Sequence, residues 1–117
     1  MLVLVYRKCS TCLKAFKWLE ENQVAFEERP IVEENPTYDE LKAWQQMSGL
    51  PLKKFFNTSG LLYKELNLKN RLPEMSDEEQ LRLLATNGML VKRPLVVGED
   101  FVLTGFKEKE WEERMKG

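Results

Sequence analysis

The chain contains no histidine, and this absence removes several mechanisms from consideration. Hydrolysis by a Cys–His pair, catalysis by a Ser–His–Asp triad and mixed Cys/His zinc sites all require an imidazole. The two cysteines could join a zinc site only if carboxylates, or the cysteines of a second copy, completed it. The sequence therefore predicts no metal site within one chain.

An excess of charge and a long apolar run are also lacking. The 117 residues carry 18 Lys and Arg against 19 Asp and Glu, so the formal net charge of -1 provides no field to gather DNA or an anionic membrane. The first apolar run, at 2–6, is far shorter than the ~7 to 15 residues of a signal-peptide core or the ~20 of a membrane span. We therefore expect a cytoplasmic protein without a direct nucleic-acid or membrane partner, and nothing requires more than a monomer.

The two cysteines, Cys9 and Cys12, follow this apolar run and lead into a segment with helical spacing. Both thiols are thus expected where a buried strand turns into a helix. The first N–H groups of a helix lack internal partners and carry the positive end of the helix dipole, which favours a thiolate at Cys9. Arg7 and Lys8 add positive charge nearby. The sequence therefore predicts a reactive cysteine with a second thiol one turn away.

Hydrophobic periodicity predicts a single α/β domain over residues 1–117, with a helical insertion at 36–88. Thr37 and Glu40 have capping-box spacing, as have Ser76 and Glu79, so a helix is expected to begin at each pair. The expected strands are 2–6, 24–32 (ended or placed at an edge by Pro30), 89–97 and 101–103. The expected helices are 11–21, 38–47, 50–56, 76–87 and 107–115, with 61–68 either a short helix or an irregular segment.

This order, with the cysteine pair after the first strand and Arg93-Pro94 entering the third, resembles the thioredoxin-like fold with a helical insertion between the second and third strands. The chain is similar to the arsenate reductase (ArsC-like) family, including its Spx-type regulators. The resemblance covers essentially the whole chain and rests on four blocks: 5–15, 57–60 with 63–66, 92–97, and 105–106. It implies a mixed sheet flanked by helices.

The resemblance also assigns roles to residues of the predicted site. It implies that Cys9 is the nucleophile, that Arg93 faces the cysteine loop and binds oxyanions, and that Pro94 is the cis-proline of the fold. Cys12 is expected to complete the catalytic set as the resolving thiol. The residues expected to bind substrate are Lys8, Ser10, Thr11, Asn57 and Pro94.

The chain departs from the members of the family that reduce arsenate. Those proteins have three arginines around the cysteine, whereas here Asn57 stands at the first position, the 105–106 region lacks the third, and only Arg93 is left. Each lost charge-assisted contact costs on the order of 1.5 to 3 kcal/mol, so a doubly charged oxyanion should be held weakly. Those reductases also commonly use a single active-site cysteine.

The predicted function is therefore thiol–disulfide exchange on an undetermined substrate, a small thiol or a protein disulfide. No bound cofactor is expected, and the reductant would be glutathione or a thioredoxin- or glutaredoxin-type protein. The alternative is a redox-switched Spx-type regulator that binds the C-terminal domain of the RNA polymerase α subunit. Gly49 lies near the position where those regulators carry a glycine in their polymerase-contacting insert.

Simpler interpretations of the same residues stay open at this point. Two packed thiols without chemistry also fit the cysteine spacing. A solvated charge on a strand edge fits Arg93, and a plain turn fits 57–60.

Overall fold

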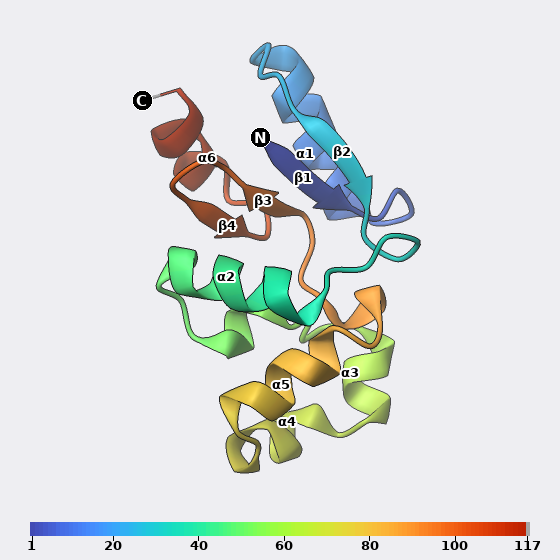
Figure 1. Ribbon diagram of the computed structural model, residues 1–117. Helices are drawn as coiled ribbons and strands as arrows, with labels where there is room; N and C mark the ends of the chain where they lie inside the picture. The colour runs from blue at the N-terminus through green and yellow to red at the C-terminus, as the bar shows by residue number, and fades with distance from the viewer. Residues whose placement is uncertain (117) are drawn as a thin grey trace.

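Three short apolar segments and one polar edge segment form a mixed four-stranded sheet with the strand order β2-β1-β3-β4 (Figure 1). The computed structural model describes residues 1–116. The strands are β1 (Leu2–Val5), β2 (Glu27–Pro30), β3 (Leu95–Val97) and β4 (Val102–Thr104). β1 runs parallel to β2 and antiparallel to β3, which is antiparallel to β4. The predicted fold class is confirmed.

Helices flank this sheet and fill the connection between its second and third strands. α1 (Ser10–Glu21) joins β1 to β2, and α6 (Glu108–Met115) follows β4. The segment between β2 and β3 contains α2 (Tyr38–Ser48), α3 (Leu61–Glu65), α4 (Leu68–Arg71), α5 (Asp77–Leu84) and the 3-10 helices η1 (Leu52–Phe55), η2 (Leu72–Glu74) and η3 (Gly88–Leu90). Within residues 1–116, no helix is both long and apolar enough to span a membrane.

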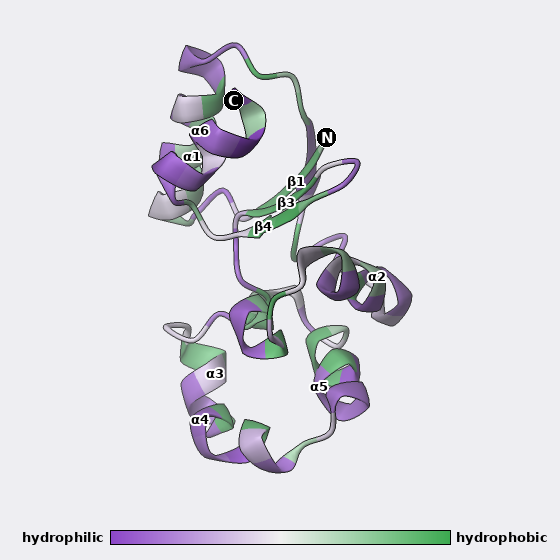
Figure 2. Cartoon of the chain, turned by 90° about the vertical axis from the view of Figure 1, so that its left-hand side faces the viewer, coloured by the Kyte–Doolittle hydropathy of each residue, from purple (hydrophilic) through white to green (hydrophobic). Residues whose placement is uncertain are grey.

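Side chains alternate across the sheet and bury a core on each face. Val3 of β1 packs with α1 and α6, where the rings of Trp18 and Trp111 meet edge to face with centroids 5.7 Å apart. Leu4 points the other way, into a core shared with Leu41 of α2 and the rest of the insertion. Figure 2 shows α1 and α6 on one side of the sheet and α2 on the other.

Both predicted capping boxes are present. The Thr37 hydroxyl accepts from the Glu40 N–H at 3.1 Å, and the Glu40 carboxylate accepts from the Thr37 N–H at 3.0 Å. Ser76 and Glu79 repeat this exchange at 3.1 and 2.9 Å. Gly49 ends α2 in the left-handed conformation, with φ +67°. The starts of both helices and the end of the first are therefore as predicted.

The third strand is much shorter than the prediction of 89–97. Residues 88–90 form η3, and Val91 makes only an isolated bridge to Phe56. The Arg93–Pro94 peptide is cis, as the resemblance implies, and β3 begins at Leu95. Leu90 and Val91, before the proline, are buried, but burial alone does not distinguish a strand from a 3-10 turn.

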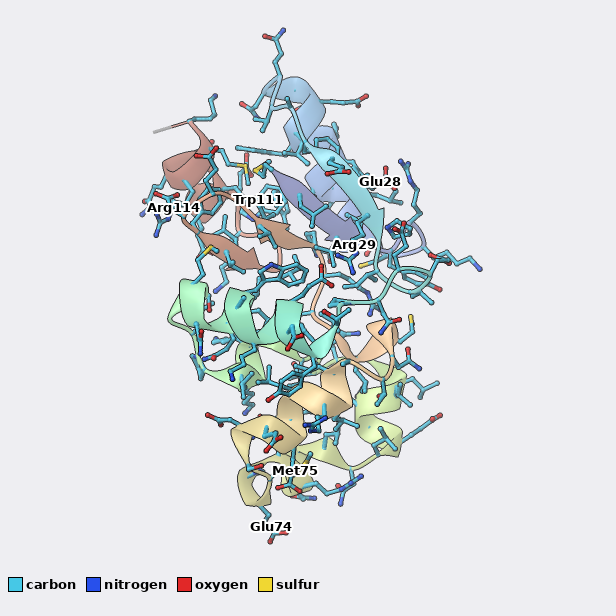
Figure 3. All side chains as sticks on the ribbon, in the orientation of Figure 1. Glu28, Arg29, Glu74, Met75, Trp111 and Arg114 are labelled. Carbon is cyan, nitrogen blue, oxygen red and sulfur yellow. The ribbon has the colours of Figure 1, made fainter. Side chains whose placement is uncertain are left out.

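β2 is an edge strand that ends at Pro30, so the prediction of 24–32 was too long at both ends. Its Arg29 (Figure 3) donates to both carboxylate oxygens of Glu40, at 2.7 and 2.9 Å. These hydrogen bonds hold the pKa of Glu40 at about 2 despite the opposing effect of burial. This pair joins the sheet edge to the first turn of α2. The side chains of Arg29 and Glu40 are 18% and 34% exposed, so solvent partly screens their interaction.

Replacing Glu40 by glutamine should lower the free energy of unfolding at pH 7 by about 1 to 2 kcal/mol, a figure reduced for solvent screening. Glutamine can keep the capping box, so the loss reports the charged pair with Arg29. The folded-state pKa is depressed, so the stabilisation is present above the ordinary value of 4.5 and disappears as the pH falls toward about 2. Urea denaturation of both proteins across this pH range measures the difference.

The matched control is Glu79→Gln, at the same position of the second capping box. Glu79 forms no ion pair within residues 1–116, so this variant should lose less stability. Equal losses in the two variants, or a Glu40→Gln loss that does not depend on pH, would contradict the role of the Arg29 pair.

Candidate active site

Cys9 is the N-cap residue of α1. Its backbone is extended, with φ -91° and ψ 123°, and its N–H donates to the Tyr6 carbonyl at 2.9 Å, which closes a tight turn after β1. The Cys9 side chain is partly exposed, whereas Cys12, one turn further on, is fully buried. Both thiols thus lie at the junction of strand and helix that the sequence predicts.

The surroundings of Cys9 favour its ionised form. Burial by itself would raise the pKa of Cys9, but the N–H groups of Cys12 and Thr11, the Cys12 thiol and the charge of Arg93 lower it overall. The sulfur accepts no N-cap hydrogen bond of ordinary length, so the amides act on it chiefly as dipoles at the positive end of the helix. The lowered pKa increases the thiolate fraction at neutral pH.

Cys12 has the opposite character. Burial raises the pKa of Cys12 to about 12, against the effects of the Tyr6 N–H, which donates to its sulfur at 3.5 Å, and of Arg93. A charge on Cys9 contributes to the same rise in pKa, by repulsion and because the Cys12 thiol donates to it. Cys9 therefore ionises first while Cys12 keeps its proton.

Arg93 is held in place beside the two thiols. Its Nη1 donates to the Met89 carbonyl at 3.1 Å, and its guanidinium carbon lies 5.1 Å from the centre of the Tyr6 ring. With its side-chain oxygen turned toward Arg93, Asn57 accepts from Nη1 and Nη2 at 3.2 and 3.3 Å. No carboxylate within residues 1–116 pairs with Arg93, so its charge acts on Cys9 or on a bound anion.

The loop after β4 forms the opposite wall of the site. The Gly105 N–H donates to the Pro94 carbonyl at 2.8 Å, and the indole N–H of Trp111 donates to the Gly105 carbonyl at 3.2 Å. Phe106 packs edge to face against Trp111, with ring centroids 4.8 Å apart. α6 thereby holds this loop against the cis-proline segment.

These segments line an open pocket of about 230 Å³ over Cys9. The pocket is lined by Cys9, Thr11, Asn57, Ser59, Lys92, Arg93, Thr104, Gly105, Phe106 and Lys107. Two lysines and one arginine are among these residues, and no carboxylate is. A concave site lined by charge of one sign concentrates ligands of the opposite sign, so the pocket favours an anionic group next to the sulfur.

The structure brings together some of the predicted substrate-binding residues and separates others. Thr11 and Asn57 line the pocket over Cys9, and Lys8 lines a different one. Ser10 is exposed at the start of α1, and Pro94 is buried and does not line the pocket. The charge expected from Arg7 is also directed elsewhere, because Arg7 donates to Glu28 on β2, at 2.9 Å through Nε. Arg93 supplies the positive charge near Cys9 instead.

Two cations of the pocket, Lys92 and Lys107, were missed by the sequence prediction. The side chain of Lys92 passes close to Gly105. A Cβ atom on residue 105 would lie 3.1 Å from the Cε of Lys92. Lys107 follows Phe106, next to the region where the resemblance implies a third arginine. Among the residues that line the pocket, Arg93 is the one arginine, as expected, and the two lysines bring the cations to three. The sequence did contain a signal for each lysine, since one adjoins Arg93 and the other adjoins the 105–106 block.

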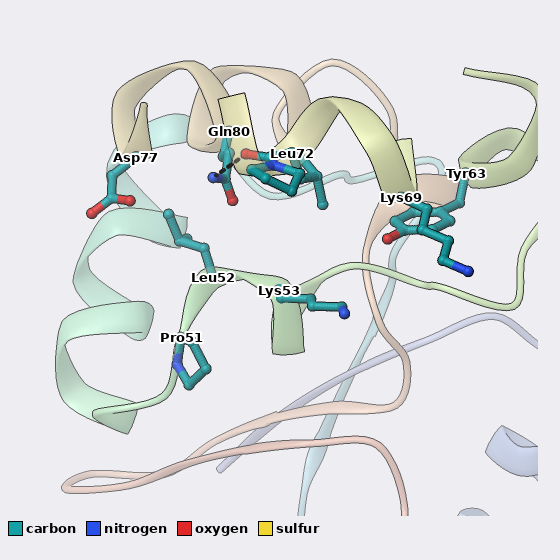
Figure 4. A pocket seen from close by; sticks show the side chains of 9 residues that line it. Pro51, Leu52, Lys53, Tyr63, Lys69, Leu72, Asp77 and Gln80 are labelled. Carbon is teal, nitrogen blue, oxygen red and sulfur yellow. Dashed lines mark hydrogen bonds between the residues drawn. The ribbon is translucent and has the colours of Figure 1, made fainter. Parts of the chain in front are cut away.

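A separate pocket of about 290 Å³ lies within the insertion (Figure 4). Lys53 and Lys69 lie on one side of it and Asp77 on the other, and Gln80 donates to the Leu72 carbonyl at 3.2 Å. It contains neither thiol and mixes charges of both signs. Among residues 1–116, no three Cys, Asp or Glu side chains gather closely enough to hold a metal ion.

Known proteins resemble this chain in sequence and fold. A model of the ArsC family matches residues 4–114. The chain belongs to the ArsC family. It is 56% identical over 108 residues to the uncharacterized protein YusI of Bacillus subtilis, across 92% of each chain. The crystal structure of an ArsC family related protein from Bacteroides fragilis is 64% identical, with a TM-score of 0.94 over 96% of this chain and 94% of that one.

A regulator is also similar to this ArsC-family chain. Global transcriptional regulator Spx 2 of Bacillus anthracis is 30% identical over 111 residues, which cover 93% of this chain and 83% of the regulator. The predicted family is therefore confirmed. Membership fixes the fold, but the activity has to be argued from the site.

The alkylation of Cys9 by iodoacetamide should follow a titration with an apparent pKa below the ~8.5 of a free thiol. Arg93→Met and Cys12→Ala should each raise this apparent pKa, since each removes a group that stabilises the thiolate. The measurement is the alkylation rate between pH 5 and 10, for which any buffer series of constant ionic strength serves. Arg7→Met is the control, because the Arg7 charge is paired with Glu28. A midpoint at or above ~8.5, or equal shifts for the two arginine variants, would contradict this assignment.

Proposed function

We propose that this ArsC-family chain is a cytoplasmic thiol–disulfide oxidoreductase in which Cys9 is the nucleophile and Cys12 the resolving thiol. The observation that carries the proposal is that two thiols one helical turn apart, next to a cationic pocket, have pKa values shifted in opposite directions. A two-cysteine exchange mechanism uses an attacking thiolate and a second thiol that acts later. The lowered pKa of Cys9 and the raised pKa of Cys12 support these two roles.

In the first step, the Cys9 thiolate attacks one sulfur of a substrate disulfide, R–S–S–R′. A bond forms between Cys9 and RS, the substrate S–S bond breaks, and R′S⁻ leaves. Arg93, held by Asn57 and the Tyr6 ring, favours the departing thiolate by its positive charge.

The mixed disulfide then activates Cys12. Once Cys9 is bonded to RS it carries no charge, so two of the effects that raise the pKa of Cys12 are removed. The Tyr6 N–H and Arg93 stay in place to stabilise the new thiolate. Cys12 gives its proton to water or to R′S⁻ and attacks the Cys9 sulfur, and RS⁻ leaves. The substrate has gained two electrons, and the protein carries a Cys9–Cys12 disulfide.

An external thiol returns this disulfide to the reduced state. Glutathione or a thioredoxin- or glutaredoxin-type protein would supply the two electrons, and the exchange requires no bound cofactor. Arsenate is a weaker candidate substrate than a disulfide. Two of the three pocket cations are lysines, which act as point charges and lack the bidentate geometry with which arginine holds an oxyanion.

The similarity to Spx 2 favours a second candidate, a redox-switched regulator that binds the C-terminal domain of the RNA polymerase α subunit. In this function, formation of the Cys9–Cys12 disulfide would be the switch. Gly49 does not decide between the candidates, since its left-handed backbone is already required to end α2. Retention of the α subunit by only one redox form of the protein would support the regulator, and no retention by either form would support the oxidoreductase.

The Cys12→Ser variant should accumulate a mixed disulfide with a disulfide-containing peptide, because the resolving thiol is missing. Wild-type protein should instead release the reduced peptide and form the internal disulfide. Cys9→Ser should form neither product above background, since Cys12 is buried and protonated. Mass spectrometry of samples quenched with acid separates these species. Exchange by Cys9→Ser at a rate near that of the wild type would refute the assignment of Cys9.

A further inference from the structure

The pocket over Cys9 continues into a larger one of about 420 Å³. The two share Lys92, Thr104 and Lys107, and the larger is also lined by Lys53, Lys54, Phe56 and Thr58. We call the two pockets together the basic groove. It runs from the reactive sulfur to η1, and its η1 end, lined by Lys53, Lys54, Phe56 and Thr58, lies beyond the residues that the exchange reaction uses.

The charge of the basic groove is of one sign. Its cations are Lys53, Lys54, Lys92, Arg93 and Lys107, and none of its lining residues is acidic. Within residues 1–116, none of these cations is in an ion pair. The whole chain has a formal net charge of -1, so this positive charge is a local concentration on a protein that is otherwise slightly acidic. Such a concentration indicates a specific anionic ligand.

The fold fixes the backbone from which the lysines of the groove extend. In η1, Leu52 and Phe55 are buried, so the two residues between them, Lys53 and Lys54, are directed outward. The Lys92 N–H donates to the Phe55 carbonyl at 2.8 Å, which joins η1 to the segment that carries Arg93. The two ends of the groove are therefore connected by backbone hydrogen bonding.

We propose that the basic groove binds an acidic, extended segment of a protein whose disulfide Cys9 attacks. This inference rests on the proposed function and specifies its substrate class. A small disulfide would fill the pocket over Cys9 alone, whereas the cations of η1 line only the part of the groove beyond it. Exposed lysines are mobile point charges, which suit carboxylates spaced along a flexible chain.

The inference is tested with Cys12→Ser protein and three peptides that carry the same disulfide. The residues flanking the disulfide are acidic in one peptide, neutral in the second and basic in the third. Mixed-disulfide formation with the acidic peptide should be at least about tenfold faster than with the neutral one at low salt, and slowest with the basic one. The difference should shrink in ~0.5 M salt, since exposed charges are screened. Rates with 2-mercaptoethanol, a thiol without charged groups, correct for the intrinsic reactivity of each peptide.

The variant that tests the groove is Lys54→Glu, which should reduce the acidic preference to threefold or less. Lys42→Glu makes the same charge change at an exposed residue of α2 that does not line the groove, and should retain the preference. Equal rates for the acidic and neutral peptides, or equal effects of the two variants, would overturn the inference and leave the oxidoreductase function standing.

A binding measurement separates the inference from the chemistry. A cysteine-free acidic peptide should bind Cys9→Ser protein and shift the amide resonances of Lys53, Lys54 and Lys92. Binding without any exchange by the wild type would refute the proposed function but support the groove. If inorganic phosphate binds and the acidic peptide does not, the groove is a small-anion site and the inference is wrong.

Discussion

Antiparallel pairing of β1 with β3 is the constraint on which the site depends. Leu4 pairs with Leu95, and continuing this register places Tyr6 opposite Arg93. The guanidinium indeed lies 5.1 Å from the Tyr6 ring, while the Tyr6 carbonyl holds the Cys9 N–H at the start of α1. A slip of one residue would turn Arg93 to the other face of the sheet and remove its charge from the sulfur. The sheet register, set by two buried cores, thereby places Arg93 beside Cys9.

The difference between the two thiols follows from a single helix. Cys9 is the N-cap residue, where amides are unpaired and solvent reaches the side chain, and Cys12 lies on the buried face one turn later. The same helical turn brings the sulfurs close enough for each to affect the pKa of the other. Ordering of the two steps is therefore a property of helix geometry and burial, and needs no histidine to act as a base.

Local signals predicted the parts of the structure that local interactions determine. Capping residues fixed the starts of α2 and α5, and the strand-to-helix junction fixed the position of Cys9. The prediction that Arg7 acts on Cys9 was wrong, because Arg7, although close to Cys9 in the sequence, forms an ion pair with Glu28. β1 and β2 pair with Val3 beside Glu28, and this pairing supplies the carboxylate that binds Arg7.

Lys92 and Lys107 were not assigned for a related reason, since they come from segments that only the closed sheet brings together. Family resemblance directed attention to the positions where arginines are expected, and not to the lysines that adjoin them. Asn57, which stands at one such position, accepts from the guanidinium of Arg93 and so orients the remaining arginine. In this chain the cationic pocket is provided by Arg93 and two lysines.

Both candidate functions use the ionised thiol of Cys9, but they require different surfaces around it. A redox switch needs a disulfide that alters a partner-binding surface, and this surface need not contain the attacking sulfur. A substrate groove has to reach the sulfur, because the reacting bond and the bound segment belong to one molecule. The cations between Cys9 and η1 form such a continuous groove, with Lys92 and Lys107 common to both of its parts. This continuity favours a substrate that is bound and attacked at a single site.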